Sequence, residues 1–358
     1  MAENLGGFGS WSVLTTDFII ILYIALGGVT LSAVLHLANG KWRFQIRYLA
    51  CSLFVLFPIA GVLLLILLAN GEQTFQWLSH AHEGEHHLPG WHNYTFLVCR
   101  EIIGYIIIGV LYGVFIKYQY LSSIDDSYRT QRRFRNIALL VPFGYFLYGS
   151  MVAWDFEMTM MPNWHSASYA PYFFQSNFHM FLAFFTILLF FLYRSGRLTK
   201  PFELYIFNFM AQFMLAMTIL YTYLYFTQYL IMWYGRLPAD MDRYYNMMLY
   251  EFAPLWWTFL ALKFVIPFTT LAITPNRHNP VVITMVACSI VLGTWIERYT
   301  WIAGSIDVQS YHHMPMTSMF DIVVTIALFA VCWIAVKWSL NRYGLLRSTG
   351  SAGGVQEI

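Results

Sequence analysis

Long apolar runs alternate with short polar segments along almost the whole chain. About nine of these runs reach the roughly 20 residues that a helix needs to cross the hydrocarbon layer. They lie near 12–38, 46–69, 93–119, 136–155, 171–193, 203–234, 253–274, 280–303 and 317–340. Backbone polar groups in lipid find partners only within a helix, so each run is predicted to be helical. The pattern predicts an all-α, polytopic membrane protein.

The composition supports this class. Hydrophobic residues make up 59% of the chain and charged residues only 11%, whereas soluble domains carry roughly 25% charged residues. The net charge of +2 comes without a basic run, so nucleic acid is not an expected partner. The start MAENLGGFGS lacks the positive region of a cleaved signal peptide, and the first apolar run is expected to stay in the membrane.

Positive charge is concentrated in alternate loops, which predicts the orientation in the membrane. The first, third, fifth and seventh loops and the C-terminal tail carry most of the Lys and Arg residues, among them Lys41, Arg43, Arg132, Arg133, Arg197, Lys200, Arg277 and Arg347. The second and fourth loops carry none. The N-terminus is therefore predicted to lie outside and the C-terminus in the cytoplasm. Residues 1–345 are expected to form one membrane domain, and 346–358 a disordered cytoplasmic tail.

Several ionisable residues fall inside the predicted spans, where a charge costs about 2.5 kcal/mol or more. With the predicted orientation, nearly all of them lie in the outer half of the membrane: Arg100, Glu101, Asp155, His179, Lys263, Glu297, Arg298 and Asp321. Arg100–Glu101 and Glu297–Arg298 are adjacent pairs. Neighbours on a helix point about 100° apart, so each member is expected to find its partner on another helix. Two interpretations stay open: a salt-bridge network that only fixes packing, or a polar pocket that binds a ligand and moves protons.

The segment AWDFEMTMMPNWHSASYAPYFF, residues 153–174, favours the pocket. It places Asp155 and His165 on the outer side, and because the segment contains no Lys or Arg, Asp155 is expected to be an unpaired acid. Oxidation of a quinol releases two protons, which a carboxylate and an imidazole can accept at hydrogen-bond distance. Aromatic residues flank the two groups and are suited either to the membrane interface or to a quinone headgroup: Trp154, Trp164, Tyr169 and Tyr172.

The cysteines and histidines give little support for a bound cofactor. Cys51, Cys99, Cys288 and Cys332 are scattered singly in apolar runs, which argues against an iron–sulfur cluster. Haem between spans needs facing histidines, and His36 and His179 lie near opposite faces. The loop SHAHEGEHHLPGWH, residues 79–92, is interpreted as a solvated or partner-facing loop, with a metal site as the alternative. His312 and His313 receive the same interpretation.

A combination of motifs resembles the NrfD/PsrC-like membrane subunits, and among them the paired ActC and ActF subunits of alternative complex III. Asp155, ten residues before His165 in a Pro-x-Trp-His sequence and followed by Pro171-Tyr172-Phe173, is similar to the ActC pattern, as is WIERY at 295–299. FTQYLIMWYG at 226–235 resembles the ActF version, with Gln228 where ActC-like chains tend to have a carboxylate. VIPF at 265–268 occurs in both.

The resemblance implies two four-helix bundles related by a pseudo-twofold, here within about 46–193 and 203–340, plus a flanking helix. It implies a quinol substrate near the outer face, no haem, iron–sulfur cluster or flavin on this chain, and possible proton conduction. The implied partners are a periplasmic iron–sulfur or molybdopterin-type subunit, multihaem cytochrome c subunits, a second NrfD-like membrane subunit and lipid. The implied location is the bacterial inner membrane.

The sequence thus predicts a quinol-oxidising subunit of a respiratory complex without a redox centre of its own. Asp155 and His165 are expected to contact the headgroup and take its protons. Lys263 and Asp321 are expected to relay protons, and the remaining predicted pocket residues are Trp164, Tyr172, His179, Arg100, Glu101, Glu297 and Arg298. Two alternatives are a structural twin subunit without a quinone site and a transporter of ions or small solutes.

Overall fold

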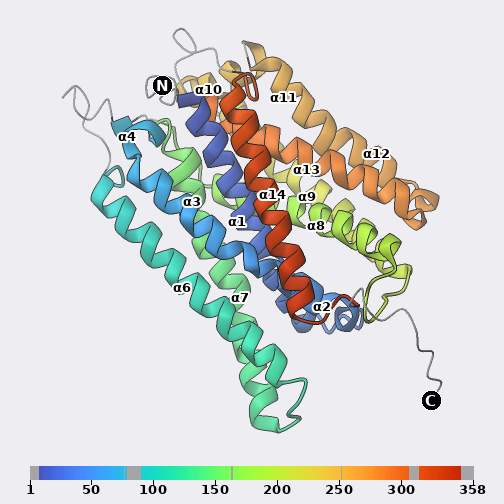
Figure 1. Ribbon diagram of the computed structural model, residues 1–358. Helices are drawn as coiled ribbons and strands as arrows, with labels where there is room; N and C mark the ends of the chain where they lie inside the picture. The colour runs from blue at the N-terminus through green and yellow to red at the C-terminus, as the bar shows by residue number, and fades with distance from the viewer. Residues whose placement is uncertain are drawn as a thin grey trace, which may run out of the picture.

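The computed structural model describes residues 8–75, 77–78, 90–162, 164–250, 252–305 and 314–347. Helices make up nearly all of this part of the chain (Figure 1). They are α1 (Phe8–Leu37), α2 (Arg43–Ser52), η2 (Leu53–Leu56), α3 (Phe57–Ala69), α4 (Gly71–Thr74), α6 (Tyr94–Leu121), α7 (Tyr128–Ala153), η3 (Trp154–Met158), α8 (Tyr169–Ser195), α9 (Tyr205–Tyr234), α10 (Pro238–Leu249), α11 (Ala253–Leu260), η4 (Ala261–Val265), α12 (Ile266–Ala272), η5 (Thr274–His278), α13 (Pro280–Ala303) and α14 (Met319–Arg342).

Within the described residues, 9 helical stretches are long and apolar enough to cross a membrane, which confirms the predicted all-α, multi-pass membrane fold. Their bounds follow the predicted runs, with one clear difference. The fourth stretch begins at Tyr128 rather than near 136. Ser127 caps this helix, and the basic residues of its first turns continue it beyond the apolar layer. Hydropathy alone does not detect such a polar extension.

Prolines coincide with breaks in two spans. A 3₁₀ turn, η2, separates α2 from α3, and Pro58 lies in the first turn of α3. The π-helical turn η4 separates α11 from α12, and Pro267 lies in the first turn of α12. Because proline has no N–H to donate to the preceding turn, the helical hydrogen bonding must change there. The second of these turns carries Lys263.

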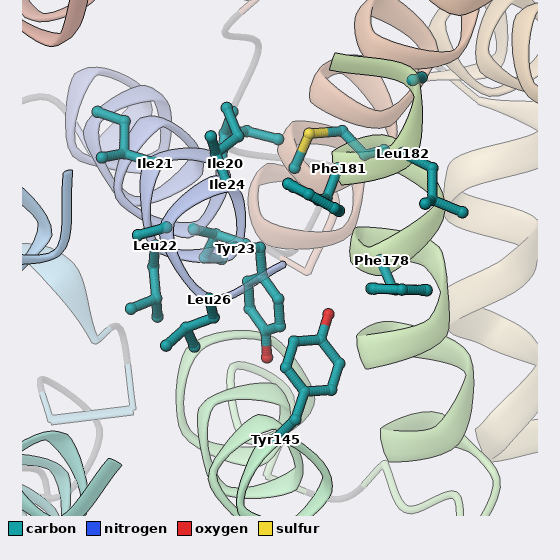
Figure 2. Close-up of a cluster of buried hydrophobic side chains, with 14 of the residues drawn as sticks. Ile20, Ile21, Leu22, Tyr23, Ile24, Leu26, Tyr145, Phe178, Phe181 and Leu182 are labelled. Atoms are coloured by element: carbon teal, nitrogen blue, oxygen red, sulfur yellow. The ribbon is translucent and has the colours of Figure 1, made fainter. Parts of the chain in front are cut away.

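The first span, α1, lies at the centre of the molecule, and 94% of its most apolar window is buried. It contacts α2, α3, α7, α8, α13 and α14. Figure 2 shows Tyr23 of α1 meeting Tyr145 of α7 near Phe178 and Phe181 of α8. A helix that is apolar on all sides is suited to such a core position. By contrast α14 lies at the periphery, against α1, α2 and η2.

Glycines allow the closest helix contacts. A Cβ on Gly28 would lie 2.0 Å from the carbonyl oxygen of Ala50, so α1 and α2 cross backbone to backbone there. In the GVLYG pattern of α6, a Cβ on Gly109 would meet the Phe57 ring at 2.7 Å, whereas one on Gly113 would meet nothing within 4 Å. The pattern thus serves packing at Gly109 only.

The two ends of the helical array differ in charge. One end, which we call the α10 end, holds the start of α1, α4, η3 and α10; the other, the α2 end, holds α2 and the α6–α7 hairpin (Figure 1). The basic loops predicted to be cytoplasmic all lie at the α2 end. The expected disordered tail is partly ordered, because Leu346 pairs with Leu198 and the Arg347 N–H donates to the Arg197 carbonyl at 2.7 Å. Residues 348–358 lie outside the described residues.

Candidate functional site

The π-helical turn η3 at the α10 end presents two acids to different neighbours. It carries Asp155 and Glu157, and both side chains are fully buried. Residues two apart in a helical turn point to nearly opposite sides. Asp155 accordingly faces Arg100 of α6, while Glu157 faces Arg298 of α13. The turn therefore joins two polar clusters toward the α10 end of the helical array.

The first cluster, which we call the Trp91 cluster, consists of Trp91, Arg100, Glu101 and Asp155. The Arg100 guanidinium donates to both Asp155 oxygens, from Nε at 2.7 Å and from Nη2 at 2.5 Å. The Trp91 indole also donates to Asp155 Oδ1 at 2.8 Å, and the Arg100 guanidinium lies 4.1 Å from the centre of the Trp91 ring. The expectation of an unpaired acid at Asp155 is therefore wrong. Its partner comes from a helix more than fifty residues earlier, which local sequence could not reveal.

Glu101 completes the Trp91 cluster without a described donor of its own. Its side chain is fully buried, and neither oxygen accepts a hydrogen bond from an N–H or O–H group among the described residues. Its charged neighbours are Asp155 and Arg100. Two carboxyl groups thus lie together beside one guanidinium, and a hydrogen bond between them requires a shared proton.

The second cluster, which we call the Glu297 network, consists of Glu157 on η3, Lys263 on η4, and Glu297 and Arg298 on α13. Arg298 Nη1 donates to Glu157 Oε2 at 2.7 Å, and its Nη2 lies 3.0 Å from Glu297 Oε2. Lys263 Nζ lies 2.5 Å from the same Glu297 oxygen. Further groups donate to the two carboxylates: Tyr169 to Glu157, and Tyr172, Ser176 and Tyr221 to Glu297.

The prediction that the adjacent charged residues find partners on other helices is confirmed for Arg100, Glu297 and Arg298, but not for Glu101, which has no donor among the described residues. Arg100 binds Asp155, and Arg298 and Glu297 bind Glu157 and Lys263 respectively. Arg298 and Glu297 also contact each other, which the helical geometry of neighbours did not predict. The four charges of the Glu297 network balance within it.

The aromatic residues of the 153–174 segment belong to the interior. Trp164, Tyr169 and Tyr172 are buried, so the interpretation as an interfacial belt is wrong for these three. The Trp301 indole donates to the Tyr172 hydroxyl at 2.9 Å, and Trp164 donates to the Asp240 carbonyl at 3.1 Å. These contacts close the α10 end over the Glu297 network.

His165 lies apart from this interior. Its side chain is exposed, and the structure gives it no hydrogen bond to a described residue. It is within electrostatic range of His92, which also interacts electrostatically with Arg100 and Asp155. His92 donates from Nε2 to the Thr159 carbonyl at 3.2 Å, and burial lowers its pKa. Of the histidine-rich loop, His80, His82, His86 and His87 lie outside the described residues, as do His312 and His313.

Two other predicted residues are separate from the clusters or only border them. His179 of α8 is buried and lies 3.2 Å from the Thr218 hydroxyl, within electrostatic range of Lys263 and Glu297. Asp321 of α14 is buried beside Asp17 of α1.

Sequence reasoning missed three buried polar groups. Asp17 accepts hydrogen bonds from Trp295 at 2.8 Å and Thr325 at 2.7 Å. The signal for it was present, because Asp17 is a charged residue within the first apolar run. Glu157 lies in the 153–174 segment, but the sequence assigns it no role. Arg243 follows the sixth apolar run, where a loop charge is expected, yet it is fully buried, and burial lowers its pKa. No local sequence pattern around Arg243 indicates that its side chain is buried.

Gln228, singled out by the resemblance, connects the 159–168 segment to α10. Its Oε1 accepts from Ser166 at 3.0 Å and from Ser168 at 3.3 Å, and its Nε2 donates to the Tyr244 hydroxyl at 2.6 Å. An amide meets both kinds of neighbour, since it accepts on one side and donates on the other. Gln228 thus has a structural role at the α10 end.

No protein-family model matches this chain, and no curated protein matches it either.

Proposed function

We propose that this chain is the quinol-binding membrane subunit of a respiratory oxidoreductase complex. One observation carries the proposal: Asp155 and Glu101 lie together beside Arg100 at the α10 end, with acceptor positions still open. Asp155 Oδ2 accepts only from Arg100 among the described donors, and a carboxylate oxygen can accept more than one hydrogen bond. Buried charged groups in a membrane mark functional sites more often than packing sites.

The chemistry of a quinol suits two neighbouring carboxyl groups. Oxidation of one quinol gives a quinone, two protons and two electrons. The hydroxyl groups would donate to Asp155 and Glu101. Because a hydrogen bond between these two carboxyl groups already holds one proton, the pair would take one quinol proton and the imidazole of His165 the other, while Arg100 supplies a fixed positive charge. The half-buried Trp91 ring would pack against the headgroup, and His165 would contact it from the exposed edge. The two electrons would pass to an iron–sulfur partner docked on the same face.

The Glu297 network offers a route for protons away from the quinol. Tyr23 of α1 lies within electrostatic range of both Glu101 and Glu157. From Glu157 a chain of ion pairs continues through Arg298 and Glu297 to Lys263. The second expected relay residue, Asp321, belongs with Asp17 and would serve a separate role.

The orientation follows from the basic loops at the α2 end, which the positive-inside rule places in the cytoplasm. The α10 end would then face the periplasm of a bacterial inner membrane. An iron–sulfur or molybdopterin-type subunit, cytochrome c subunits and a second membrane subunit of the same kind would complete the proposed complex.

Turnover with a soluble quinol, measured on the assembled complex, tests the proposal. Asp155→Asn and Glu101→Gln keep the shape but remove a proton acceptor, and each should lower turnover by about 100-fold or more. His165→Ala should weaken binding of a quinone analogue. Asp126→Asn, an exposed acid in the α6–α7 hairpin, is the matched control and should leave turnover unchanged. Near-normal turnover in the first two variants would favour a structural subunit, and ion flux into liposomes without quinol would favour a transporter.

A further inference from the structure

Arg243 of α10 is a buried cation held by neutral groups. Its guanidinium Nη2 donates to the Glu157 carbonyl at 2.8 Å, to the Trp301 carbonyl at 3.0 Å and to the Ser305 hydroxyl at 2.7 Å. Nη1 lies 3.5 Å from the Met158 carbonyl. Within the described part of the chain, no carboxylate forms an ion pair with it.

Two indole rings enclose the same guanidinium. It lies 4.5 Å from the centre of the Trp164 ring and 4.9 Å from that of Trp301. A buried charge is costly unless hydrogen bonds and aromatic faces replace its water. An apolar residue would fill the same volume at lower cost, so packing alone does not explain an arginine here.

The oxygens that Arg243 binds belong to two helix ends. Glu157 and Met158 end the π-helical turn η3, and Trp301 lies in the last turn of α13. Carbonyl groups at a helix end lack partners within the helix. A planar guanidinium with several N–H groups can join two such ends at a fixed angle, which a lysine cannot. Because Glu297 and Arg298 lie on α13, the same joint relates them to Glu157.

We infer that Arg243 is a positioning residue that locks η3 against α13 and so aims the Glu157 carboxylate at Arg298. Its contact with the main chain of Glu157 is direct, and its stacking on Trp164 secures the segment that follows η3. Asp155, two residues before Glu157 on the same turn, is held toward Arg100 by the same lock. The inference concerns the geometry of η3 and rests on the proposed function only where quinol turnover is measured.

Site-resolved carboxyl labelling tests the lock without quinol. The purified chain in detergent is treated with dicyclohexylcarbodiimide, and mass spectrometry gives the labelled fraction of Glu157 relative to Asp17, which lies in a separate cluster. Arg243→Met removes both the charge and the N–H groups of the guanidinium, and Arg243→Lys keeps the charge without the planar guanidinium. We expect both variants to raise Glu157 labelling several-fold. Arg236→Met, at an exposed arginine just before α10, is the matched control and should match the unchanged protein.

Each result decides the inference. Unchanged Glu157 labelling in the Arg243→Met variant would overturn it, and so would wild-type labelling in the Arg243→Lys variant, because charge alone would then suffice. If Arg243→Met does not accumulate in the membrane, the Arg243→Lys labelling decides alone. In the assembled complex, both variants should also lower kcat for quinol oxidation more than they raise KM. Absent turnover in the unchanged complex would refute the proposed function and leave the labelling result intact.

Discussion

At the scale of single residues, Glu297 is the most heavily bound group of the interior. Both of its oxygens accept hydrogen bonds from buried donors, which are Tyr172, Ser176, Tyr221 and Lys263, and Arg298 adds an ion pair. A buried carboxylate needs such a shell, because water is not there to solvate it. The shell also makes the charges interdependent, since removing one leaves another unpaired.

Breaking the Lys263–Glu297 pair from one side should be costly. Lys263→Met and Glu297→Gln each leave an uncompensated buried charge, and each should lower the free energy of unfolding by about 3 to 5 kcal/mol. The double variant should lose less than the sum of the two, because it removes both charges. Thermal unfolding in detergent measures this, with the exposed Lys337→Met as control. Strictly additive losses would show that the two groups do not depend on each other.

His92 should make stability depend on pH. Nε2 donates to the Thr159 carbonyl and Nδ1 is buried without a described partner, so a second proton would have no acceptor. Burial therefore lowers the folded-state pKa below the usual value of about 6.5. The unfolded chain then binds more protons below that pH, so stability is complete above about pH 6.5 and falls as the pH approaches about 5.

The measurement is the melting temperature of the protein between those pH values. His92→Gln keeps a donor for the Thr159 carbonyl but does not titrate, and its melting temperature should fall less on acidification. The charged groups that face His92 are His165, Arg100 and Asp155, and they are unchanged in the variant. An identical pH dependence in both proteins would assign the effect to other groups.

At the scale of elements, two π-helical turns hold the polar centre. η3 carries Asp155 and Glu157, and η4 carries Lys263. A π turn contains one extra residue, so the helix beyond it presents a different face, and such turns are frequent at functional sites. The turn η4 rests on Gly293 of α13, where an added Cβ would lie 2.8 Å from Lys263 Cγ and 2.8 Å from Leu262 Cβ.

A methyl group at that contact should displace η4. Gly293→Ala forces apart two packed helices and should lower the free energy of unfolding by about 1 to 3 kcal/mol. Under the proposed function it should also lower quinol turnover, since Lys263 moves away from Glu297. Gly113→Ala is the matched control, because its Cβ would meet nothing within 4 Å. Equal stability of the two variants would show that the turn accommodates the methyl group.

At the scale of the whole molecule, polarity separates the two ends of the array. The α2 helix and the basic α6–α7 hairpin lie at one end, and α10 lies at the other (Figure 1). Arg243 is part of α10, and the Trp91 cluster and the Glu297 network meet at η3. The central helix α1 runs from the α10 end to the α2 end, and its buried side chains are mostly apolar. This separation places the proposed chemistry near the face predicted to be external.

Cysteine accessibility tests the orientation. A single cysteine at Ser127, in the hairpin between α6 and α7, should react with a membrane-impermeant maleimide only after the cells are opened. A cysteine at Arg236, before α10, should react in intact cells, because that loop is predicted to be periplasmic. The opposite pattern would reverse the orientation and with it the proposed docking face of the electron acceptor.

The sequence by itself determined the nine membrane-spanning stretches and the sites of most buried charges. Both follow from composition along the chain, since lipid demands long apolar helices and makes each intramembrane charge conspicuous. The sequence also predicted that Arg100 and Glu297 find their charged partners on other helices. No comparable sequence signal predicted the π-helical turn η3 that carries Glu157.

Only the tertiary structure decided which charges meet. Asp155 with Arg100, Glu157 with Arg298 and the burial of Arg243 depend on how each helix is rotated about its axis and which helices are neighbours. Hydropathy carries no information on either, because lipid and protein interior are both apolar. Each π turn adds a further rotation of about 100° that residue counting does not include. For that reason Asp155 looked free in the sequence and is ion-paired in the fold.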